Sequence, residues 1–341
     1  MRIIGQILGI LLKIIICVLV ITVTFAVSLI LLSGPYAEPP EVIPEQPPTF
    51  EEMIPQGSRN DSYVMVSLLI GEEIVELPLE IYLIGAVSAE MPASFELEAL
   101  KAQAVAARTN VLYRMHVMPN LRHPNAQACT DYTCCMAYSD DENLRERWGE
   151  DYIRYITRVI GAVLDTDGIY ISYKGEPILA VFHSSSAGKT EASGNVWITD
   201  LPYLTSVDSP ETAELVPGYI TTVTAPKQDF KDKIANVRPD AVFGASEGSW
   251  ITDITYTDSG RILELTIGGA AFRGTELRSM FSLRSTAVSF EWIGDDIVFT
   301  VTGNGHGVGL SQYGANAMAM DRINFRSILN HYYTDVELLP K

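Results

Sequence analysis

One glutamate stands in an apolar sequence context that suits a general acid. Glu90 lies in the sequence Ala-Glu-Met-Pro, directly before an alanine-rich stretch that carries Lys101 and Arg108. Burial among apolar neighbours disfavours the ionised form of a carboxyl group and raises its pKa. A general acid must hold its proton near neutral pH, so such burial would suit that role. A glutamate near a helix end is also commonly a solvated side chain or a cap partner, and the residues alone leave both interpretations open.

Four further side chains have the composition of a metal site. His123, Cys129, Cys134 and Cys135 would make a tetrahedral set of one histidine and three thiolates, as in structural zinc sites. Cys17 lies in the apolar N-terminal segment and stands apart. The spacing matches no standard zinc-finger pattern, and one disulfide with a free thiol is the alternative. A site with four protein ligands would be closed and therefore structural.

Two loops of small residues are candidate ligand-binding segments. Residues 183–190 end in Gly-Lys-Thr but lack the first glycine of a P-loop, so no phosphate cradle is encoded. A serine hydrolase with His183 or His306 as base is an alternative, but the G-x-S-x-G elbow is missing. Two interpretations of this segment remain open: a loop that binds sugar hydroxyls, and a simple turn with capping serines. In 303–314, alternate glycines near His306 and Gln312 allow close approach to a ligand, or only a tight turn.

The elements that must position these residues follow from periodicity and turn signals. A short helix over 78–89 would end at Glu90, and Ser94 would cap a second helix with a buried alanine-rich stripe. The strands precede the first helix and follow the second. The predicted strands are 64–69 and 73–77 around Gly71, then 169–173, 178–182 and 261–267, and a further helix spans 310–320.

Composition limits the partners of this chain. It has 341 residues, 47% of them hydrophobic, and a formal net charge of −18. Such a surface repels nucleic acid and anionic lipid, so we expect no nucleic-acid partner.

The N-terminus predicts a membrane anchor. Residues 14–32 form nineteen apolar or uncharged positions, with Arg2 and Lys13 before them and glutamates after them. This length spans a bilayer, and the charge distribution places the rest of the chain outside the cytoplasm. A cleaved signal peptide, cut after residue 37, is the alternative.

The predicted domains follow from these boundaries. Residues 1–33 form the cytoplasmic tip and anchor, and 34–61 form an extended linker rich in proline and glutamate. The extracytoplasmic domain spans 62–341, with a second lobe over about 216–284.

Four sequence blocks in order resemble the stage II sporulation protein D (SpoIID) family of endospore-forming bacteria. The resemblance runs from about residue 64 to residue 336. Its blocks are Ala-Glu-Met-Pro with the following Glu-Ala-Leu-Lys-Ala-Gln-Ala-Val-Ala-Ala-Arg-Thr, then Ser-Ser-Ser-Ala-Gly-Lys-Thr, Leu-Pro-Tyr-Leu, and Gly-His-Gly-Val-Gly-Leu-Ser-Gln-Tyr-Gly-Ala. The N-terminal anchor also fits that family.

The resemblance implies a peptidoglycan lytic transglycosylase that acts during engulfment of the forespore. Such enzymes cleave between N-acetylmuramic acid and N-acetylglucosamine and leave a 1,6-anhydro end. The family's acid matches Glu90, and no cofactor is needed for catalysis. The implied partners are a SpoIIP-like amidase, which strips the stem peptides first, and a SpoIIM-like membrane protein. A glycan-binding module that only stimulates an amidase is the alternative.

The resulting prediction is an α+β fold of helices and mixed, largely antiparallel sheets. Two lobes would flank a glycan-binding cleft, preceded by the single transmembrane helix. Because a nearby cation would lower the pKa of Glu90, we expect Lys101 and Arg108 to contact substrate or a loop rather than that carboxyl group. The candidates for holding the glycan or supporting the acid are Lys101, Arg108, Ser185, Tyr203, His306 and Gln312.

Overall fold

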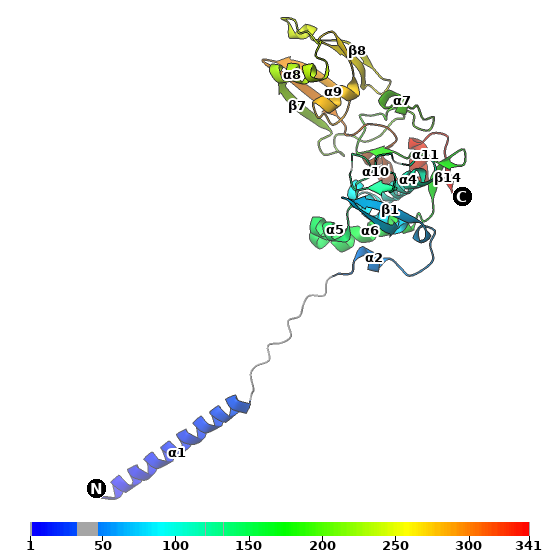
Figure 1. Cartoon of the computed structure of the whole chain (residues 1–341). Coiled ribbons are helices and arrows are strands. Elements are labelled where there is room, and N and C mark those ends of the chain that lie inside the picture. Colours follow the sequence, from blue (N-terminus) through cyan, green and yellow to red (C-terminus); the bar gives the residue numbers. More distant parts are fainter. Residues whose placement is uncertain (1, 33–46, 120, 132, 341) are drawn as a thin grey trace. The chain divides into compact units, whose positions relative to one another are not determined.

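The computed structural model of the chain describes residues 2–32, 47–119, 121–131 and 133–340 (Figure 1). It consists of two compact units, Met1–Pro47 and Pro48–Lys341. In the first unit, a single helix, α1 (Arg2–Leu32), contains a segment, Ile7–Leu29, that is long and apolar enough to cross a membrane. This segment begins before the predicted residue 14 and includes Lys13. The proline-rich stretch 34–46 of the predicted linker lies outside the described residues.

The second unit begins at Pro48, so the predicted boundary at residue 62 is too late. The short helix α2 (Phe50–Met53) is capped by Thr49, whose side chain accepts a hydrogen bond from the Glu52 backbone. The buried Phe50 donates its backbone N–H to Asp141 Oδ1 at 2.9 Å. Residues 48–61 therefore belong to the folded unit, because they bury an aromatic side chain and satisfy their backbone groups there.

The helices at the centre of this unit place Glu90 at a helix end. α3 (Leu79–Glu90) packs on α4 (Leu97–His116) and α6 (Tyr152–Leu164), and α5 (Asp141–Trp148) packs on α6. α3 is buried on nearly every side, and a Cβ at Gly85 would lie 2.3 Å from the Tyr138 ring. The predicted Ser94 cap is wrong. The Phe95 N–H bonds the Pro92 carbonyl in a turn, and α4 starts after Glu96, whose N–H donates to Asn316 Oδ1 at 2.8 Å.

Antiparallel and parallel pairings surround these helices. The predicted hairpin around Gly71 is confirmed as β1 (Met65–Ile70) and β2 (Glu73–Pro78), and β3 (Ala128–Cys129) joins β1 in parallel. The predicted strand 178–182 is wrong: the hairpin partner of β4 (Tyr170–Tyr173) is only β5 (Glu176–Pro177). β6 (Phe182–His183) pairs instead in parallel with β13 (Leu310–Ser311), far away in the sequence.

A second hydrophobic core lies within the same unit, between residues 225 and 301. Two three-stranded antiparallel sheets, β10-β9-β8 and β11-β12-β7, enclose it with α8 and α9. This core extends beyond the predicted second lobe at its C-terminal side, because β12 pairs with both β7 and β11. Mixed helices and largely antiparallel sheets after an N-terminal apolar helix agree with the predicted fold class.

The remaining elements have these bounds: η1 (Asp61–Tyr63), η2 (Gly149–Asp151), α7 (Ser193–Val196), β7 (Ile220–Pro226), α8 (Lys227–Val237), η3 (Glu247–Ser249), β8 (Ile251–Tyr256), β9 (Ile262–Ile267), β10 (Ala270–Arg273), α9 (Gly274–Met280), β11 (Val288–Ile293), β12 (Asp296–Thr302), α10 (Gln312–Met320), α11 (Phe325–Tyr332) and β14 (Glu337–Leu339).

Candidate functional site

A cavity of about 620 Å³ opens beside Glu90. Its volume falls within the range typical of small-molecule pockets, roughly 300–1,000 Å³. Its walls combine apolar side chains with a few polar ones. The lining residues are Glu90, Asn110, Arg114, Thr133, Cys134, Cys135, Met136, Leu179, Val181, Phe182, Trp197, Thr199, Leu201 and His306. None of them lies in 216–284, so the two-lobed cleft stays a prediction.

The carboxyl group of Glu90 is in an environment that opposes ionisation. Glu90 is the last residue of α3, and burial raises the pKa of its side chain. The backbone N–H of Ala137 donates to Oε1 at 2.5 Å and partly opposes this shift. Within the described part of the chain, no lysine or arginine lowers this pKa. The expectation that Lys101 and Arg108 do not pair with Glu90 therefore agrees with the structure.

Gln312 binds the backbone of Glu90 and does not line the cavity. Its Nε2 donates to the Glu90 carbonyl oxygen at 2.9 Å and lies 3.5 Å from Gln103 Oε1. Gln312 is buried at the start of α10 and is not part of the lining. The structure thus places this predicted substrate-binding residue against the backbone of Glu90, outside the cavity, where it positions the end of α3.

His306 lines the cavity as a neutral ring. Burial and the nearby Arg278 lower its pKa to about 4. Its Nδ1 accepts the Val308 N–H at 3.0 Å, which leaves the single ring proton on Nε2. The ring lies 5.2 Å from that of Trp197, another wall residue. Because its pKa is low and its Nδ1 lone pair already accepts the Val308 N–H, His306 shapes the wall and is poorly suited to act as a base.

The serine loop that follows β6 is internal. His183 Nε2 lies 2.7 Å from Ser186 Oγ, but both residues are buried, and burial keeps the pKa of His183 well below its usual value. Ser185 is also buried, and its backbone bridges that of Asn304. A nucleophilic serine must be reachable by substrate, so the serine-hydrolase alternative has no support at Ser185 or Ser186.

The glycine loop before β13 is held from inside. Gly303, Gly305, Gly307 and Gly309 all have positive φ, as their spacing suggested. The N–H of Gly303 bonds the Tyr219 carbonyl and that of Gly305 bonds the Arg284 carbonyl, each at 2.8 Å. These donors are used within the protein, so a hydrogen bond from this backbone to a ligand is not supported at these two positions.

His123, Cys129, Cys134 and Cys135 come together as the sequence predicted. Their ligand atoms all lie within 4.8 Å of one another. His123 Nδ1 lies 2.9 Å from the Ala126 carbonyl, so Nε2 faces the sulfurs, 3.2 Å from Cys135 Sγ. Ligands of a tetrahedral zinc ion would be roughly 3.8 Å apart, close to the 3.9 Å between the sulfurs of Cys134 and Cys135. The donor set therefore fits zinc.

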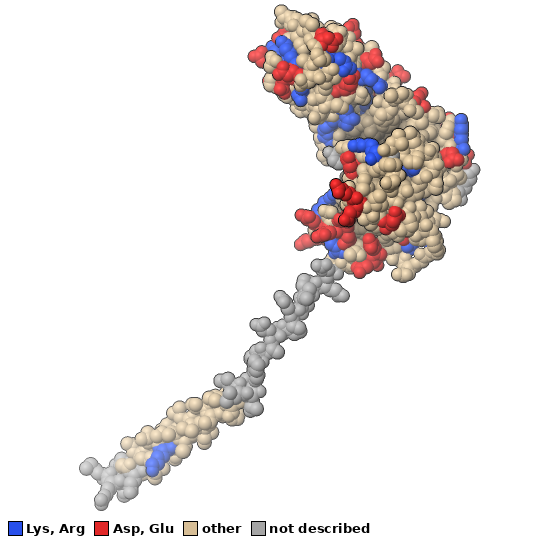
Figure 2. Space-filling model, in the orientation of Figure 1, with Lys and Arg blue, Asp and Glu red and all other residues tan. Residues whose placement is uncertain are grey.

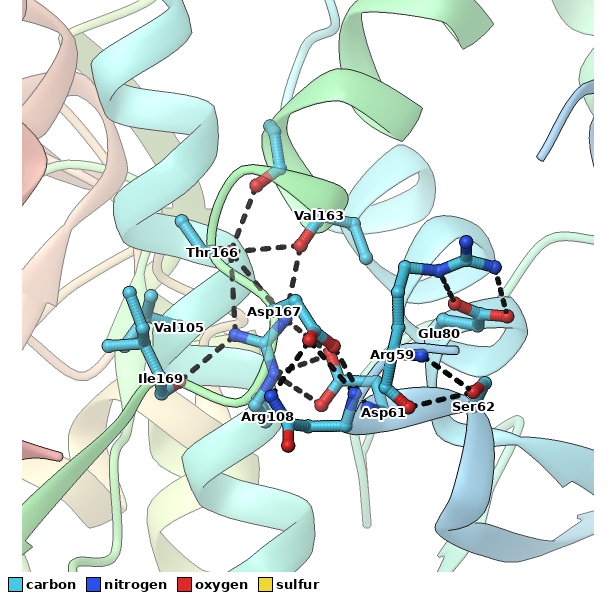
Figure 3. Close-up of polar contacts among 12 residues, drawn as sticks. Arg59, Asp61, Ser62, Glu80, Val105, Arg108, Val163, Thr166, Asp167 and Ile169 are labelled. Carbon is cyan, nitrogen blue, oxygen red and sulfur yellow. Dashed lines mark hydrogen bonds and ion pairs between the residues drawn. The ribbon is translucent and has the colours of Figure 1, made fainter. Parts of the chain in front are cut away.

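Arg108 does not line the cavity, contrary to the prediction that it holds the glycan. Figure 3 shows its side chain among Asp61, Thr166 and Ile169. Its Nη2 lies 2.6 Å from Asp61 Oδ2, and the two side chains are 1% and 3% exposed. Further hydrogen bonds reach the Ile169 carbonyl at 3.0 Å and Thr166 Oγ1. A side chain with no exposed surface cannot contact a polysaccharide, so Arg108 fastens the start of the folded unit to α4.

Lys101 and Tyr203 also lie outside the lining. Lys101 bonds Glu98 at 3.1 Å and Asp165 at 3.0 Å. Tyr203 is buried, and its hydroxyl accepts the N–H of Leu179, a wall residue, at 3.2 Å. Of the candidates predicted from sequence, the structure therefore brings Glu90, His306 and two of the cysteines to the cavity.

Sequence reasoning missed several wall residues. Asn110 and Arg114 lie one turn apart on α4, and Trp197 and Thr199 follow α7. The four-residue spacing of Asn110 and Arg114 was the available signal, because positions four apart share a helix face.

Comparison with known proteins identifies similar chains. Residues 71–173 match the family model described as "SpoIID: Stage II sporulation protein". Stage II sporulation protein D of Bacillus amyloliquefaciens is 36% identical over 268 residues, which cover 78% of this chain and 75% of that protein. The Bacillus subtilis protein of the same name is also 36% identical, over 269 residues, 78% of this chain and 76% of that one. A Bacillus subtilis protein named "Amidase enhancer" is 29% identical over 314 residues, 74% of this chain and 40% of that protein.

Proposed function

Because the chain belongs to the stage II sporulation protein D family, we propose that this sporulation protein is a peptidoglycan lytic transglycosylase with Glu90 as its acid. The observation that carries the proposal is the position of Glu90, a carboxyl group with a raised pKa on the wall of a large cavity. The substrate is a glycan strand from which the stem peptides have been removed.

The chemistry needs one carboxyl group. Most glycosidases use two, one as acid and one as base or nucleophile. Here the protonated Glu90 gives its proton to the glycosidic oxygen as the bond from muramic acid C1 breaks. The 6-hydroxyl of the same sugar attacks C1 and gives its proton to the Glu90 carboxylate. The ring closes to a 1,6-anhydro sugar, and the acid is regenerated without water.

The surroundings of Glu90 support both stages. Burial favours the protonated acid before bond cleavage, and the Ala137 N–H stabilises the carboxylate that forms afterwards. A group that serves first as an acid and then as a base works best when its pKa lies near the working pH.

We also propose a structural zinc ion held by His123, Cys129, Cys134 and Cys135. Through Cys134 and Cys135, the ion would tie the segment between β3 and α5 to Cys129 and His123 by coordinate bonds, without a part in the reaction. That segment contains Ala137, the hydrogen-bond donor to Glu90. The cluster would therefore fix one side of the acid's environment.

The proposed location is the mother-cell membrane at the sporulation septum, as a single-pass protein with its folded unit outside the cytoplasm. One N-terminal apolar helix supports a single-pass membrane protein. Proposed partners are a SpoIIP-like amidase, which would remove the peptides first, and a SpoIIM-like membrane protein.

The test uses purified full-length protein in detergent and denuded glycan strands, with mass spectrometry of the products. Wild type should release 1,6-anhydro muramic ends, and Glu90→Gln should release none. Arg154→Gln, on the exposed face of α6, is the control. Equal anhydro product from wild type and Glu90→Gln would refute the assignment of the acid.

One observation favours a second function. A relative is named "Amidase enhancer", which suggests a glycan-binding module that stimulates an amidase. In that case neither wild type nor Glu90→Gln would release anhydro product, and both would raise the rate of a purified amidase on intact peptidoglycan.

A further inference from the structure

The cavity contains a guanidinium group without an acidic partner, and we propose that Arg114 binds the free lactyl carboxylate of a peptide-free muramic acid residue. This inference rests on the proposed substrate, and it assigns the residue that would distinguish stripped strands from intact ones. Arg114 would thus be a specificity-determining residue.

The placement of Arg114 is the first support. Arg114 and Asn110 both line the cavity from α4, one turn apart. Asn110 Nδ2 donates to the Ala180 carbonyl at 3.3 Å and so is engaged with the protein. Arg114, by contrast, forms no ion pair or hydrogen bond with the residues that the structure describes. Its guanidinium carbon lies 5.9 Å from the centroid of the Tyr113 ring.

The other arginines near the helical core show how unusual this is. Arg108 on the same helix is fully engaged by Asp61 and backbone carbonyls. Arg158 donates to the carbonyls of Ala93 and Phe95. A half-buried guanidinium that lines a cavity without such partners keeps its hydrogen-bonding capacity for a ligand.

The charge of the cavity is the second support. Among the lining residues, Glu90 has the carboxyl group and Arg114 the guanidinium group, and burial favours the neutral form of Glu90. Arg114 therefore gives this part of the wall a positive charge, within a chain whose net charge is −18. Figure 2 shows acidic side chains gathered over the region of α2 and α5. An anionic strand would be repelled by such a surface and attracted at Arg114.

The ligand follows from this chemistry. The lactyl group of muramic acid carries a carboxylate only after the stem peptide has been removed; before that it is a neutral amide. Arginine binds a carboxylate through two parallel charge-assisted hydrogen bonds, whereas an amide offers one neutral acceptor. An intact strand would leave the guanidinium group buried and poorly paired. Its binding would therefore lack the ion pair and would also carry the free-energy cost of unsatisfied donors.

The experiment compares two substrates on full-length protein in detergent. One is denuded glycan strands, and the other is the same strands with the lactyl carboxylates converted to methylamides. Wild type should show a KM about tenfold or more higher for the methylamide strands, as expected when a charge-assisted contact is lost. Arg114→Gln should show equal and high KM values for both, with kcat changed little. Arg114→Lys should keep part of the preference, and Arg154→Gln all of it.

The outcomes separate this inference from the proposed function. If Arg114→Gln keeps the wild-type ratio of KM values, the inference is wrong although the enzyme assignment stands. If wild type releases no anhydro product, the enzyme assignment fails, and binding of fluorescently labelled strands decides on Arg114. A preference for carboxylate strands that Arg114→Gln abolishes supports the site, and equal binding of both strands overturns it.

Discussion

The buried ion pair between Arg108 and Asp61 predicts a strong and non-additive effect on stability. The two side chains meet at 2.6 Å with almost no exposed surface (Figure 3). Burial raises the pKa of Asp61 more than Arg108 lowers it, so the pair is not a large net source of stability. Removal of one partner, however, leaves the other charge buried and unpaired.

The expected magnitudes follow from this asymmetry. Arg108→Met or Asp61→Leu should lower the free energy of unfolding by about 3–5 kcal/mol, as is typical when a buried pair is broken. The double variant Asp61→Leu/Arg108→Met should lose less than the sum of the single losses, with a coupling free energy of about 2–3 kcal/mol. Lys101→Met is a suitable control: its partner Asp165 is 54% exposed, and a loss below about 1 kcal/mol is expected.

The assay is urea unfolding of the full-length protein, followed by tryptophan fluorescence. Single variants that lose less than 1 kcal/mol, or losses that add in the double variant, would contradict a buried structural pair. Activity separates this role from glycan binding. The folded fraction of an Arg108→Lys sample should keep the wild-type KM, whereas a substrate-binding residue would raise it.

Three further predictions concern the site. Burial raises the pKa of Glu90, so wild type loses stability as the pH rises from the pKa of the unfolded state through the raised pKa of the folded state. The free energy of unfolding of Glu90→Gln, measured in urea, should therefore exceed that of wild type at pH 8 but not at pH 4. The expected difference is about 1.4 kcal/mol for each unit by which the pKa is raised. Protein purified without added zinc should contain one zinc and, beyond Cys17, three thiols that react only after chelation, whereas a disulfide among them would exclude the site. Gly305→Ala would set a Cβ 2.7 Å from that of His183 at a φ of +114° and should cost about 2 kcal/mol or more, against about 1 for Gly175→Ala, which meets no neighbour; equal losses would contradict the close contact.

Local pattern was sufficient for the elements around Glu90. The hairpin of β1 and β2 and the end of α3 follow from alternation, a glycine turn and a proline after the helix, all of which act over a few residues. The proximity of His123, Cys129, Cys134 and Cys135 was also predictable, because a metal site and a disulfide both require such side chains to lie close together.

Tertiary contacts decided the rest. The two-residue pairing of β6 with β13 has no periodic signal, because it joins segments more than a hundred residues apart. α4 is buried around most of its circumference, so no stripe indicates which side faces the cavity. Arg108 could therefore be placed on the helix but not assigned to Asp61, and Arg114 was not singled out.

Segments that are distant in the sequence contact Glu90 because it lies at the end of a helix. The last carbonyl groups of a helix lack partners within the helix, and the C-terminal end carries a partial negative charge. In α3 the carbonyl of Glu90 itself accepts from Gln312, at the start of α10, while the carboxyl group accepts from Ala137. The partial negative charge at the end of α3 therefore disfavours ionisation of the Glu90 carboxyl group, as burial also does. A carboxyl group at the start of a helix would instead be held ionised, so its location at the end of α3 is itself part of what keeps the proton available.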